Sequence, residues 1–354
     1  CGGVNKMRGE IVVSVKNLKA NAAAYRSRIS DKVALIGVVK ADGYNHGAGA
    51  IAKNVKEFSS FAVATSDEAI ALRAATTKPV LMLGYADKTE MRDLLREKMT
   101  LCAWEDSQIR DIASVAKDTC ERANVHIALD TGMNRIGVKD MERAEKLCDI
   151  CNLCGVKITG VFSHLYDCAN DETSARQLQK FKELSRVFPK TAIRHLSASG
   201  RAADRNYGFS AVRLGIGLYG YGENFVSPCM SVTGEVVRNV RLKRGECVGY
   251  GGKFVAEKPT FVATVSVGYA DGLPRSYTGG EVIINGKKHK IIGSVCMDYC
   301  FVEVDNGVCA GDEVIFIGES GNQKITAEDI AAKVGTISYE VLTGFKRLKK
   351  RYIL

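Results

Sequence analysis

The 354-residue sequence has no uninterrupted apolar segment approaching the roughly 20 residues that a membrane-spanning helix needs, and it shows no signal peptide. Long runs of one charge sign are also scarce. Although the net charge is +10 and the pI is near 9.0, the basic residues are mostly interspersed with acids. The one dense basic cluster, residues 346–351, has no interleaved aromatics, which indicates a solvated tail rather than a nucleic-acid site. We therefore expect that this 354-residue sequence binds no nucleic acid and makes no membrane contact.

The cysteines do not form the pattern of a disulfide-rich secreted domain. All twelve are scattered through apolar segments of a large chain, which favours reduced thiols and a cytoplasmic location. Cys148, Cys151 and Cys154 form a C-x2-C-x2-C run, but Ile158 stands where an iron–sulfur run needs its fourth cysteine. The spacing favours three thiols on one side of a helix, and we expect no metal. The first residue, Cys1, suggests a processed product or a fragment of a longer protein.

Short apolar, β-branched runs alternate with amphipathic segments from residue 33 onward. The expected strands are 33–41, 61–65, 80–85, 101–104, 125–130, 158–164, 193–197 and 212–219. Helices are expected at 17–29, 67–75, 89–97, 107–117, 141–154 and 172–187, and a loop or single turn at 200–210. Eight βα units in about 200 residues predict an α/β fold, a (β/α)8 TIM barrel, with a doubly wound open sheet as the alternative.

After about residue 230 the pattern changes to strand-like runs joined by glycine-rich turns. These runs are 232–242, 260–267, 280–284, 289–295, 301–303 and 313–317, and Asn285-Gly286 predicts a hairpin. A helix at 326–334 and a strand ending at Tyr352 complete a mainly-β domain. The predicted domains are therefore a barrel at 9–229 and a β domain at 230–354, and the latter can also pair with an early strand at 8–15.

Lys40 ends the first apolar strand and precedes a loop with two glycines, Gly43 and Gly47. Apolar neighbours desolvate an amine and lower its pKa, as attack on an aldehyde requires. Tyr44 adds a hydroxyl, and the glycines let backbone N–H groups approach an anion such as phosphate. Taken alone, this pattern fits an ordinary surface lysine at a strand-to-helix loop equally well.

Further polar residues follow the later strands. Arg135 can hold a carboxylate through two hydrogen bonds, and Ser199 suits a phosphate after the seventh strand. His164 and Arg213 also fall at or just past strand ends, so a barrel gathers all of these with Lys40 on one face. Taken singly, the histidine could be a structural hydrogen-bonder and the last arginine a salt-bridge partner.

The chain carries, in this order, V-V-K-A-D-G-Y-N-H-G, D-T-G-M-N-R-I-G, S-A-S-G, V-R-L-G-I-G-L-Y-G, V-G-Y-A-D-G-L-P-R and V-C-M-D. Together these motifs resemble the alanine racemase family of pyridoxal-phosphate enzymes, over nearly the whole chain. The resemblance implies racemisation of a small amino acid, L-alanine to D-alanine or L-serine to D-serine, for peptidoglycan precursors. It also implies a homodimer.

The resemblance assigns the catalytic roles residue by residue. Lys40 would bind the cofactor and act as the base on one face of the substrate Cα. Tyr269, reaching in from the partner subunit, would serve the other face, because racemisation returns a proton to the side opposite its removal. Arg213 would face the pyridine nitrogen, and His164 would assist Tyr269 and Arg213.

The binding roles come from the same resemblance. Tyr44 and Ser199, with backbone donors near Tyr219, would hold the cofactor phosphate, while Arg135 and the Met297 backbone would bind the substrate carboxylate. The implied cofactor-binding residues are Lys40, Tyr44, Ser199, Arg213, Gly215 and Tyr219.

The sequence departs from the family pattern around the pocket. Ala128 stands where many relatives carry a lysine, so something else, such as a bound anion, must brace Arg135. Ser294 stands where an arginine is common, Leu214 replaces the proline of R-P-G, and the ending near Arg347 is unusual. The substrate thus stays open. Serine would fit the cytoplasmic racemase domain of a membrane-anchored vancomycin-resistance protein.

Two rival functions share the cofactor. A barrel-plus-β-domain decarboxylase of basic amino acids uses acidic recognition and a catalytic cysteine, which the motifs do not favour. A non-catalytic binding protein of the single-barrel kind lacks a second domain, so residues 230–354 discriminate against it.

Overall fold

The computed structural model describes residues 9–354, which divide into two compact units. One unit comprises residues 17–43 and 47–227, and the other comprises 9–16, 44–46 and 228–354. Arg8, the first residue of the predicted early strand, lies outside the described residues.

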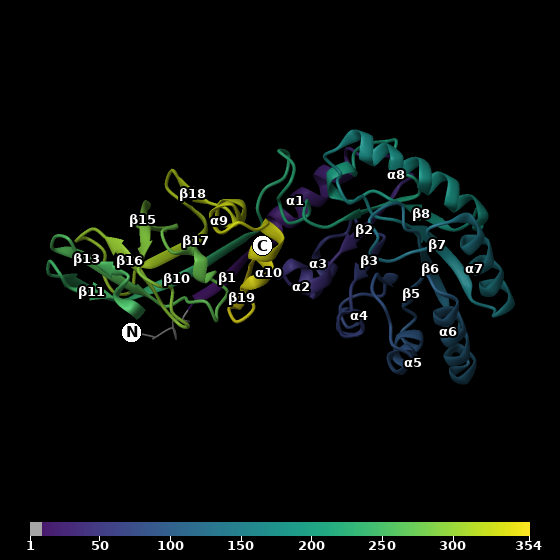
Figure 1. Cartoon of the computed structure of the whole chain (residues 1–354), viewed down its shortest axis with the longest axis horizontal. Coiled ribbons are helices and arrows are strands. Elements are labelled where there is room, and N and C mark those ends of the chain that lie inside the picture. Colours follow the sequence, from purple (N-terminus) through teal and green to yellow (C-terminus); the bar gives the residue numbers. More distant parts are fainter. Residues whose placement is uncertain (1–8) are drawn as a thin grey trace. The chain divides into compact units, whose positions relative to one another are not determined.

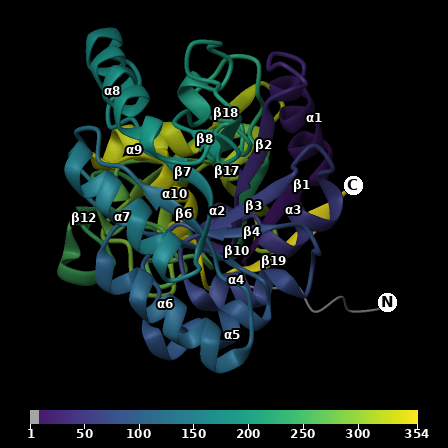
Figure 2. The same cartoon turned by 90° about the vertical axis from the view of Figure 1, so that its right-hand side faces the viewer.

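The first unit is a ring of short parallel strands with helices outside it (Figures 1 and 2). Its strands are β2 Ala34–Val38, β3 Ser60–Val63, β4 Val80–Met82, β5 Thr100–Ala103, β6 Asn124–Ala128, β7 Lys157–Phe162, β8 Ile193–His195 and β9 Ala211–Leu214. They pair in the order β8-β7-β6-β5-β4-β3-β2-β9. Between β8 and β9, Ser210 N donates to Arg194 O at 3.0 Å and Arg213 N donates to Ser197 O at 3.1 Å. The predicted barrel is confirmed, because β2 lies between β9 and β3 instead of starting an open sheet.

The helices associated with these strands are α1 Val15–Arg26, α2 Lys40–Tyr44, α3 Ala48–Asn54, α4 Ser66–Arg73, α5 Lys88–Arg96, α6 Asp106–Thr119, α7 Met141–Leu153 and α8 Asp171–Leu184. Three of them begin with the same device. Glu68 in α4, Glu90 in α5 and Gln108 in α6 each accept a hydrogen bond from the backbone N–H three residues earlier. These capping boxes fix where each strand-to-helix loop ends.

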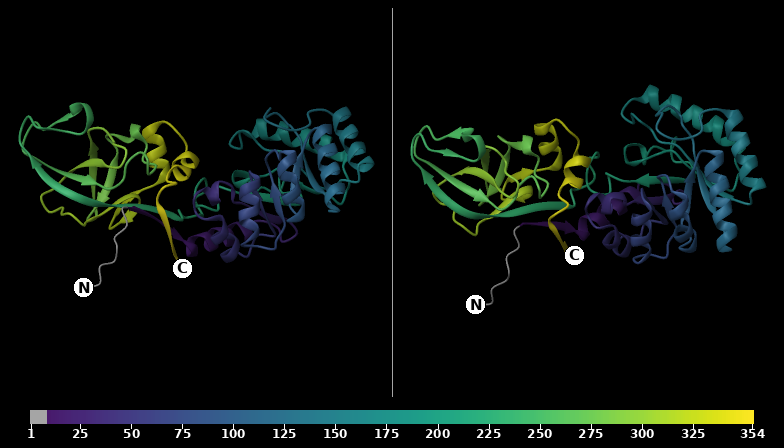
Figure 3. Two further views of the ribbon diagram at one scale, coloured as in Figure 1. Left: turned by 90° about the horizontal axis from the view of Figure 1, so that it is seen from below. Right: turned by 60° about the horizontal axis from the view of Figure 1, so that its bottom comes forward.

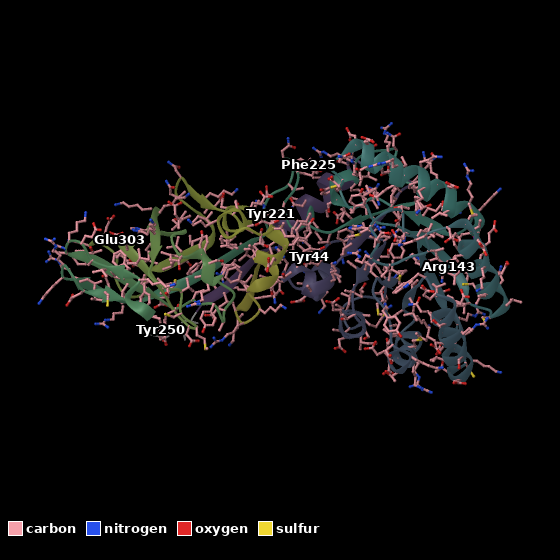
Figure 4. The ribbon with its side chains drawn as sticks, in the orientation of Figure 1. Tyr44, Arg143, Tyr221, Phe225, Tyr250 and Glu303 are labelled. Carbon is pink, nitrogen blue, oxygen red and sulfur yellow. The ribbon has the colours of Figure 1, made fainter. Side chains whose placement is uncertain are left out.

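Neighbouring helices are also linked by surface ion pairs. Arg143 of α7, labelled in Figure 4, reaches Glu105 before α6 at 2.8 Å. On the same helix, Cys148 and Cys151 lie within α7 and Cys154 caps its end, and the Cys151 side chain is buried. Among residues 9–354, no group of three or more His, Cys, Asp or Glu side chains could hold a metal ion. No helix in that range is both long enough and apolar enough to cross a membrane.

The second unit is built from antiparallel strands (Figure 3). They are β1 Gly9–Ser14, β10 Met230–Leu242, β11 Cys247–Val248, β12 Phe254–Val255, β13 Thr260–Val265, β14 Glu281–Ile284, β15 Lys287–Ile292, β16 Cys300–Val304, β17 Glu313–Ser320, β18 Gln323–Ile325 and β19 Lys349–Ile353, with helices α9 Ala327–Val334 and α10 Ser338–Gly344. A closed ring of pairings runs through β10, β13, β16, β15, β14 and β17. The early strand β1 pairs antiparallel with β10 and parallel with β19.

The predicted hairpin joins β14 to β15. Asn285 and Gly286 have φ angles of 49° and 74°, the left-handed values that a two-residue turn between twisted strands requires. The prediction at this turn is confirmed. Helix α10, in contrast, was not predicted, because residues 338–344 carry no clear apolar period.

Replacing Ile11 tests whether β1 is part of this core. Its side chain is fully buried in the β unit, so Ile11→Ala should lower the free energy of unfolding by about 3 kcal/mol. The exposed Val255, changed to alanine, should alter it by about 0.5 kcal/mol or less. Urea denaturation of both variants checks this, and equal small losses would contradict the role of β1.

Candidate active site

Lys40 begins a left-handed turn at the end of the first barrel strand. Ala41, Asp42 and Gly43 have φ angles of 50°, 52° and 64°, and Tyr44 continues the run at 51°. Such a run costs roughly 1–2 kcal/mol per non-glycine residue, so it persists only where other contacts hold it. Burial lowers the pKa of Lys40, Arg135 lowers it further, and Glu68 opposes both.

Four of the predicted residues share one region of the barrel unit: Lys40, Arg135, His164 and Arg213. The His164 imidazole has its pKa lowered to about 3 by burial and then by Arg213, Arg135 and Lys40. It is therefore neutral at physiological pH. The cluster combines three cationic side chains with a neutral imidazole, which suits a ligand carrying negative charge.

Arg213 is 3% exposed, and its partners are carbonyl oxygens and imidazoles. Its Nη1 donates to the His195 carbonyl at 2.8 Å, and its Nη2 donates to the carbonyls of Ser163 and Leu196 at 2.7 and 3.0 Å. The Nη2 atom also lies 3.2 Å from His164 Nδ1. Within residues 9–354 the Nε–H group forms no hydrogen bond and the guanidinium forms no ion pair, so one donor of a buried cation stays available.

Two histidines that sequence reasoning missed extend this network. Arg213 Nη1 lies 2.6 Å from His195 Nδ1, and His195 Nε2 lies 2.9 Å from Nδ1 of His126. Because the guanidinium can only donate, His195 must accept at Nδ1 and donate from Nε2. Burial and then Arg213 lower the pKa of both imidazoles, that of His126 to about 3. Gly160 makes room for His126, because a Cβ there would lie 2.5 Å from the ring.

A group of hydrogen-bond donors lies just past the end of β9. The Ser199 hydroxyl oxygen accepts hydrogen bonds from Gly215 N at 3.0 Å and Gly217 N at 3.1 Å, so its own proton can be donated. Between them, the Ile216 N–H donates to no group in the described part of the chain. Gly217 must be glycine, because a Cβ would lie 2.1 Å from the Tyr25 hydroxyl.

The two tyrosines assigned to the cofactor are both buried. Tyr219 donates its hydroxyl proton to Val38 O at 2.9 Å and its N–H to Ile216 O at 3.1 Å, so it links the turn after β9 to the end of β2. Tyr44 belongs to the β unit, where its ring lies 5.8 Å from that of Tyr339, and burial strongly raises the pKa of its hydroxyl.

Ala128, in place of the expected lysine, lies in an apolar cluster. It is buried with Cys102 and Phe162, and Leu83, Trp104 and Ile136 pack against them. Arg135 is exposed and forms no hydrogen bond or ion pair within residues 9–354. No side chain of the described chain therefore braces Arg135, and its guanidinium is available to a carboxylate.

Gln177 of α8 is a second residue that the sequence did not reveal. Its Nε2 donates to Thr131 Oγ1 and to the His164 carbonyl, both at 2.9 Å, and its Oε1 accepts from Tyr166 N at 3.1 Å. The side chain is 2% exposed, so all three bonds are shielded from water. One amide thus joins the loops that carry Arg135 and His164.

Tyr269 and Met297 lie on two turns of the β unit that pack against each other. Tyr269 N donates to Cys296 O at 2.9 Å, and the next N–H donates to Met297 O at 3.0 Å. Arg347 bridges the same two turns, with Nε 3.6 Å from Asp271 and Nη1 2.9 Å from Asp298. The Tyr269 side chain is 42% exposed, and Met297 is 54% exposed, so both are open to solvent in this chain.

The missed histidines had one signal in the sequence. His126 and His195 each interrupt a buried strand, and a buried arginine in a third strand needs acceptors. Gln177 had none, because a polar residue on an amphipathic helix normally faces water.

Family models for the N-terminal and C-terminal domains of alanine racemase match residues 13–223 and 229–353. The chain belongs to the alanine racemase family. Alanine racemase 2 of Caldanaerobacter subterraneus is 34% identical, covering 95% of this chain and 92% of its own. Alanine racemase 1 of Clostridium acetobutylicum is 35% identical, covering 96% and 94%.

Solved structures agree with this membership. The alanine racemase from E. faecalis superimposes with a TM-score of 0.93 at 30% identity, covering 99% of both chains. A histidine racemase from Leuconostoc mesenteroides also superimposes, with a TM-score of 0.91 at 25% identity, covering 99% of this chain and 100% of its own. The protein is accordingly a racemase enzyme that acts on an amino acid, and the resemblance noted in its motifs is confirmed.

The buried histidines should make stability depend on pH. The folded pKa of His126 is about 3, whereas an unfolded histidine titrates near 6.5. The unfolded chain therefore binds the extra proton between these values, and stability falls as the pH is lowered from about 6.5. His126→Gln should reduce the slope of unfolding free energy by about 1.4 kcal/mol per pH unit between pH 6 and 4.

Urea denaturation of the protein at several pH values measures this slope. Asn124→Ala, at the start of the same strand, should leave it unchanged. An equal slope in wild type and His126→Gln would show that the imidazole takes up its proton in the folded state.

Proposed function

We propose that this enzyme racemises a small amino acid with pyridoxal phosphate, using Lys40 and Tyr269 as bases on opposite faces of the substrate. Alanine is the expected substrate and serine the alternative, and the product would serve peptidoglycan synthesis. The observation that carries the proposal is the Arg213 Nε–H, which has no hydrogen-bond partner in the described part of the chain and lies in the same cluster as an amine of lowered pKa.

The donor set fits this cofactor. The Lys40 amine is the group that holds an aldehyde, and the Ser199 hydroxyl with the Ile216 N–H supplies donors for a phosphate. A guanidinium can donate to a pyridine nitrogen but cannot take a proton from it. Pyridoxal phosphate, when bound, withdraws electron density from the substrate Cα–H bond. The Arg213 contact would moderate that withdrawal, which favours simple return of the proton over side reactions.

The protein residues then divide the work. Lys40 removes or returns the proton on one face, and the partner's Tyr269 does so on the other. Arg135, which has no hydrogen bond or ion pair within residues 9–354, binds the substrate carboxylate, and the Met297 backbone supports the same group. His164 stays neutral, and it would connect Arg213 to Tyr269 through hydrogen bonds. This scheme requires a homodimer, and the scattered cysteines support a cytoplasmic setting.

Lys40→Ala should abolish both racemisation and the visible absorption of bound cofactor, because the amine carries both. Lys88→Ala, which removes a surface ion pair with Asp111, is the control and should retain both. Absorption and turnover measured on the reconstituted proteins check this. Racemisation by Lys40→Ala at the wild-type rate would overturn the assignment.

Tyr269→Phe should separate exchange from inversion. The variant should still exchange the α-proton of the enantiomer that faces Lys40, with retention, while racemisation falls by roughly 100-fold or more. Proton NMR in deuterium oxide, with chiral analysis of the product, measures the two processes separately. Full racemisation by this variant would refute the two-base scheme.

Side-by-side exchange with L-alanine, L-serine and L-histidine at equal concentration identifies the substrate class. Preferred exchange of alanine supports the cell-wall role, whereas faster exchange of serine supports the racemase domain of a resistance protein. No exchange with any of them, with cofactor bound, would favour a non-catalytic binding protein or a decarboxylase.

A further inference from the structure

Glu68 of α4 joins the ends of two barrel strands through one carboxylate. Its Oε1 accepts a hydrogen bond from Ala41 N at 2.6 Å, at the residue directly after Lys40. Its Oε2 accepts from Ala64 N at 2.8 Å and from Thr65 N at 3.4 Å, at the end of β3. The carboxylate thus connects the lysine-bearing turn to the start of α4.

The turn after Lys40 needs such a contact. Ala41 and Asp42 take left-handed backbone angles without the freedom of glycine, and alanine gains nothing locally from that conformation. Gly43 N donates back to Val39 O at 2.7 Å, and Ala48 N donates to the Asp42 carboxylate at 2.8 Å. These bonds lie within the segment, whereas the bond from Ala41 to Glu68 anchors the turn to a different strand end.

Another βα unit of the barrel, β5 with α6, shows which part of this contact serves the helix alone. Gln108, at the equivalent position of α6, accepts from Trp104 N at 2.8 Å and from Glu105 N at 2.9 Å through its single carbonyl oxygen. These donors correspond to Ala64 N and Thr65 N. A glutamine is therefore sufficient for the helix cap, and the second carboxylate oxygen of Glu68 is needed only for Ala41.

The charges around Lys40 also single out Glu68. Lys40 is faced by Arg135 from the loop after β6, by His164 from the end of β7 and by Glu68 from α4. The first is cationic and the second neutral, so Glu68 is the anion of this set. It offsets part of the desolvation of the amine without forming a direct ion pair with it.

We propose that Glu68 is a positioning residue for Lys40: through Ala41 N–H its carboxylate fixes the turn from which the lysine side chain extends into the site. The inference rests on the proposed role of Lys40 in holding the cofactor. It concerns no contact of Glu68 with substrate or cofactor.

Glu68→Gln is the test, because the Gln108 comparison predicts that this variant folds with α4 capped. The amide of Ala41 should then exchange with deuterium roughly tenfold faster or more, since a charge-assisted bond is lost. In the reconstituted enzyme kcat should fall by roughly tenfold while KM changes little, and the acidic limb of the pH profile should move to lower pH. The last effect follows because the removed charge was raising the pKa of Lys40.

Two further variants separate position from charge and from general stability. Glu68→Asp keeps the charge but is one methylene too short to reach both strand ends, so Ala41 exchange should rise while the pH profile stays. Glu90→Gln removes the matching cap carboxylate of α5, which reaches the Ser66 hydroxyl at the start of α4 but not the lysine turn, and should change neither. Wild-type exchange at Ala41 in Glu68→Gln, or equal acceleration in Glu90→Gln, would overturn the proposal.

The exchange measurement does not depend on turnover. Faster Ala41 exchange in a protein that shows no racemase activity would leave the positioning role intact and reject the proposed function. If the wild-type protein is active and Ala41 exchange is unaltered in Glu68→Gln, the proposed function stands and the positioning role is rejected.

Discussion

The barrel unit is organised around a buried cation, Arg213, that has no carboxylate partner among residues 9–354. Arg213 is held by the carbonyls of His195, the last residue of β8, and of Ser163 and Leu196, which directly follow β7 and β8, and by imidazole nitrogens. Desolvation lowers its pKa to about 10, yet it stays protonated at physiological pH. A buried charge is tolerated only where dipoles replace water, so the ends of β7, β8 and β9 must keep their relative positions. The ends of β8 and β9 share few backbone hydrogen bonds, and the bonds of Arg213 add a second connection between them.

Most of the architecture could be predicted from local sequence. Each barrel strand was found within a few residues of its expected range, because a β-branched apolar run buried on both faces has few alternatives. The Asn285-Gly286 hairpin was equally accessible, since its turn type demands those residues. The strand ends then placed Lys40, His164 and Arg213 together by barrel geometry alone.

The supporting residues could not be found in the same way. His126, His195, Gln177 and Glu68 each act through at least one distant partner, up to 69 positions away in the sequence for the two histidines, and no local period marks them. The left-handed turn after Lys40 was hidden as well, because alanine and aspartate at its first positions give no sign of a positive φ. Sequence patterns report burial and turn type, whereas hydrogen-bond partners across strands depend on register.

A racemase places equal demands on the two sides of its site. Mirror-image substrate and product have equal free energy, so kcat/KM is the same in both directions, and in a two-base scheme each direction needs both bases. In this chain each proposed base has its own carboxylate support. Glu68 anchors the turn of Lys40, and Asp271 and Asp298, joined by Arg347, hold the turn of Tyr269. Proton transfer is sensitive to distance. The contacts that fix the turns of Lys40 and Tyr269 therefore support proton transfer on both faces of the substrate.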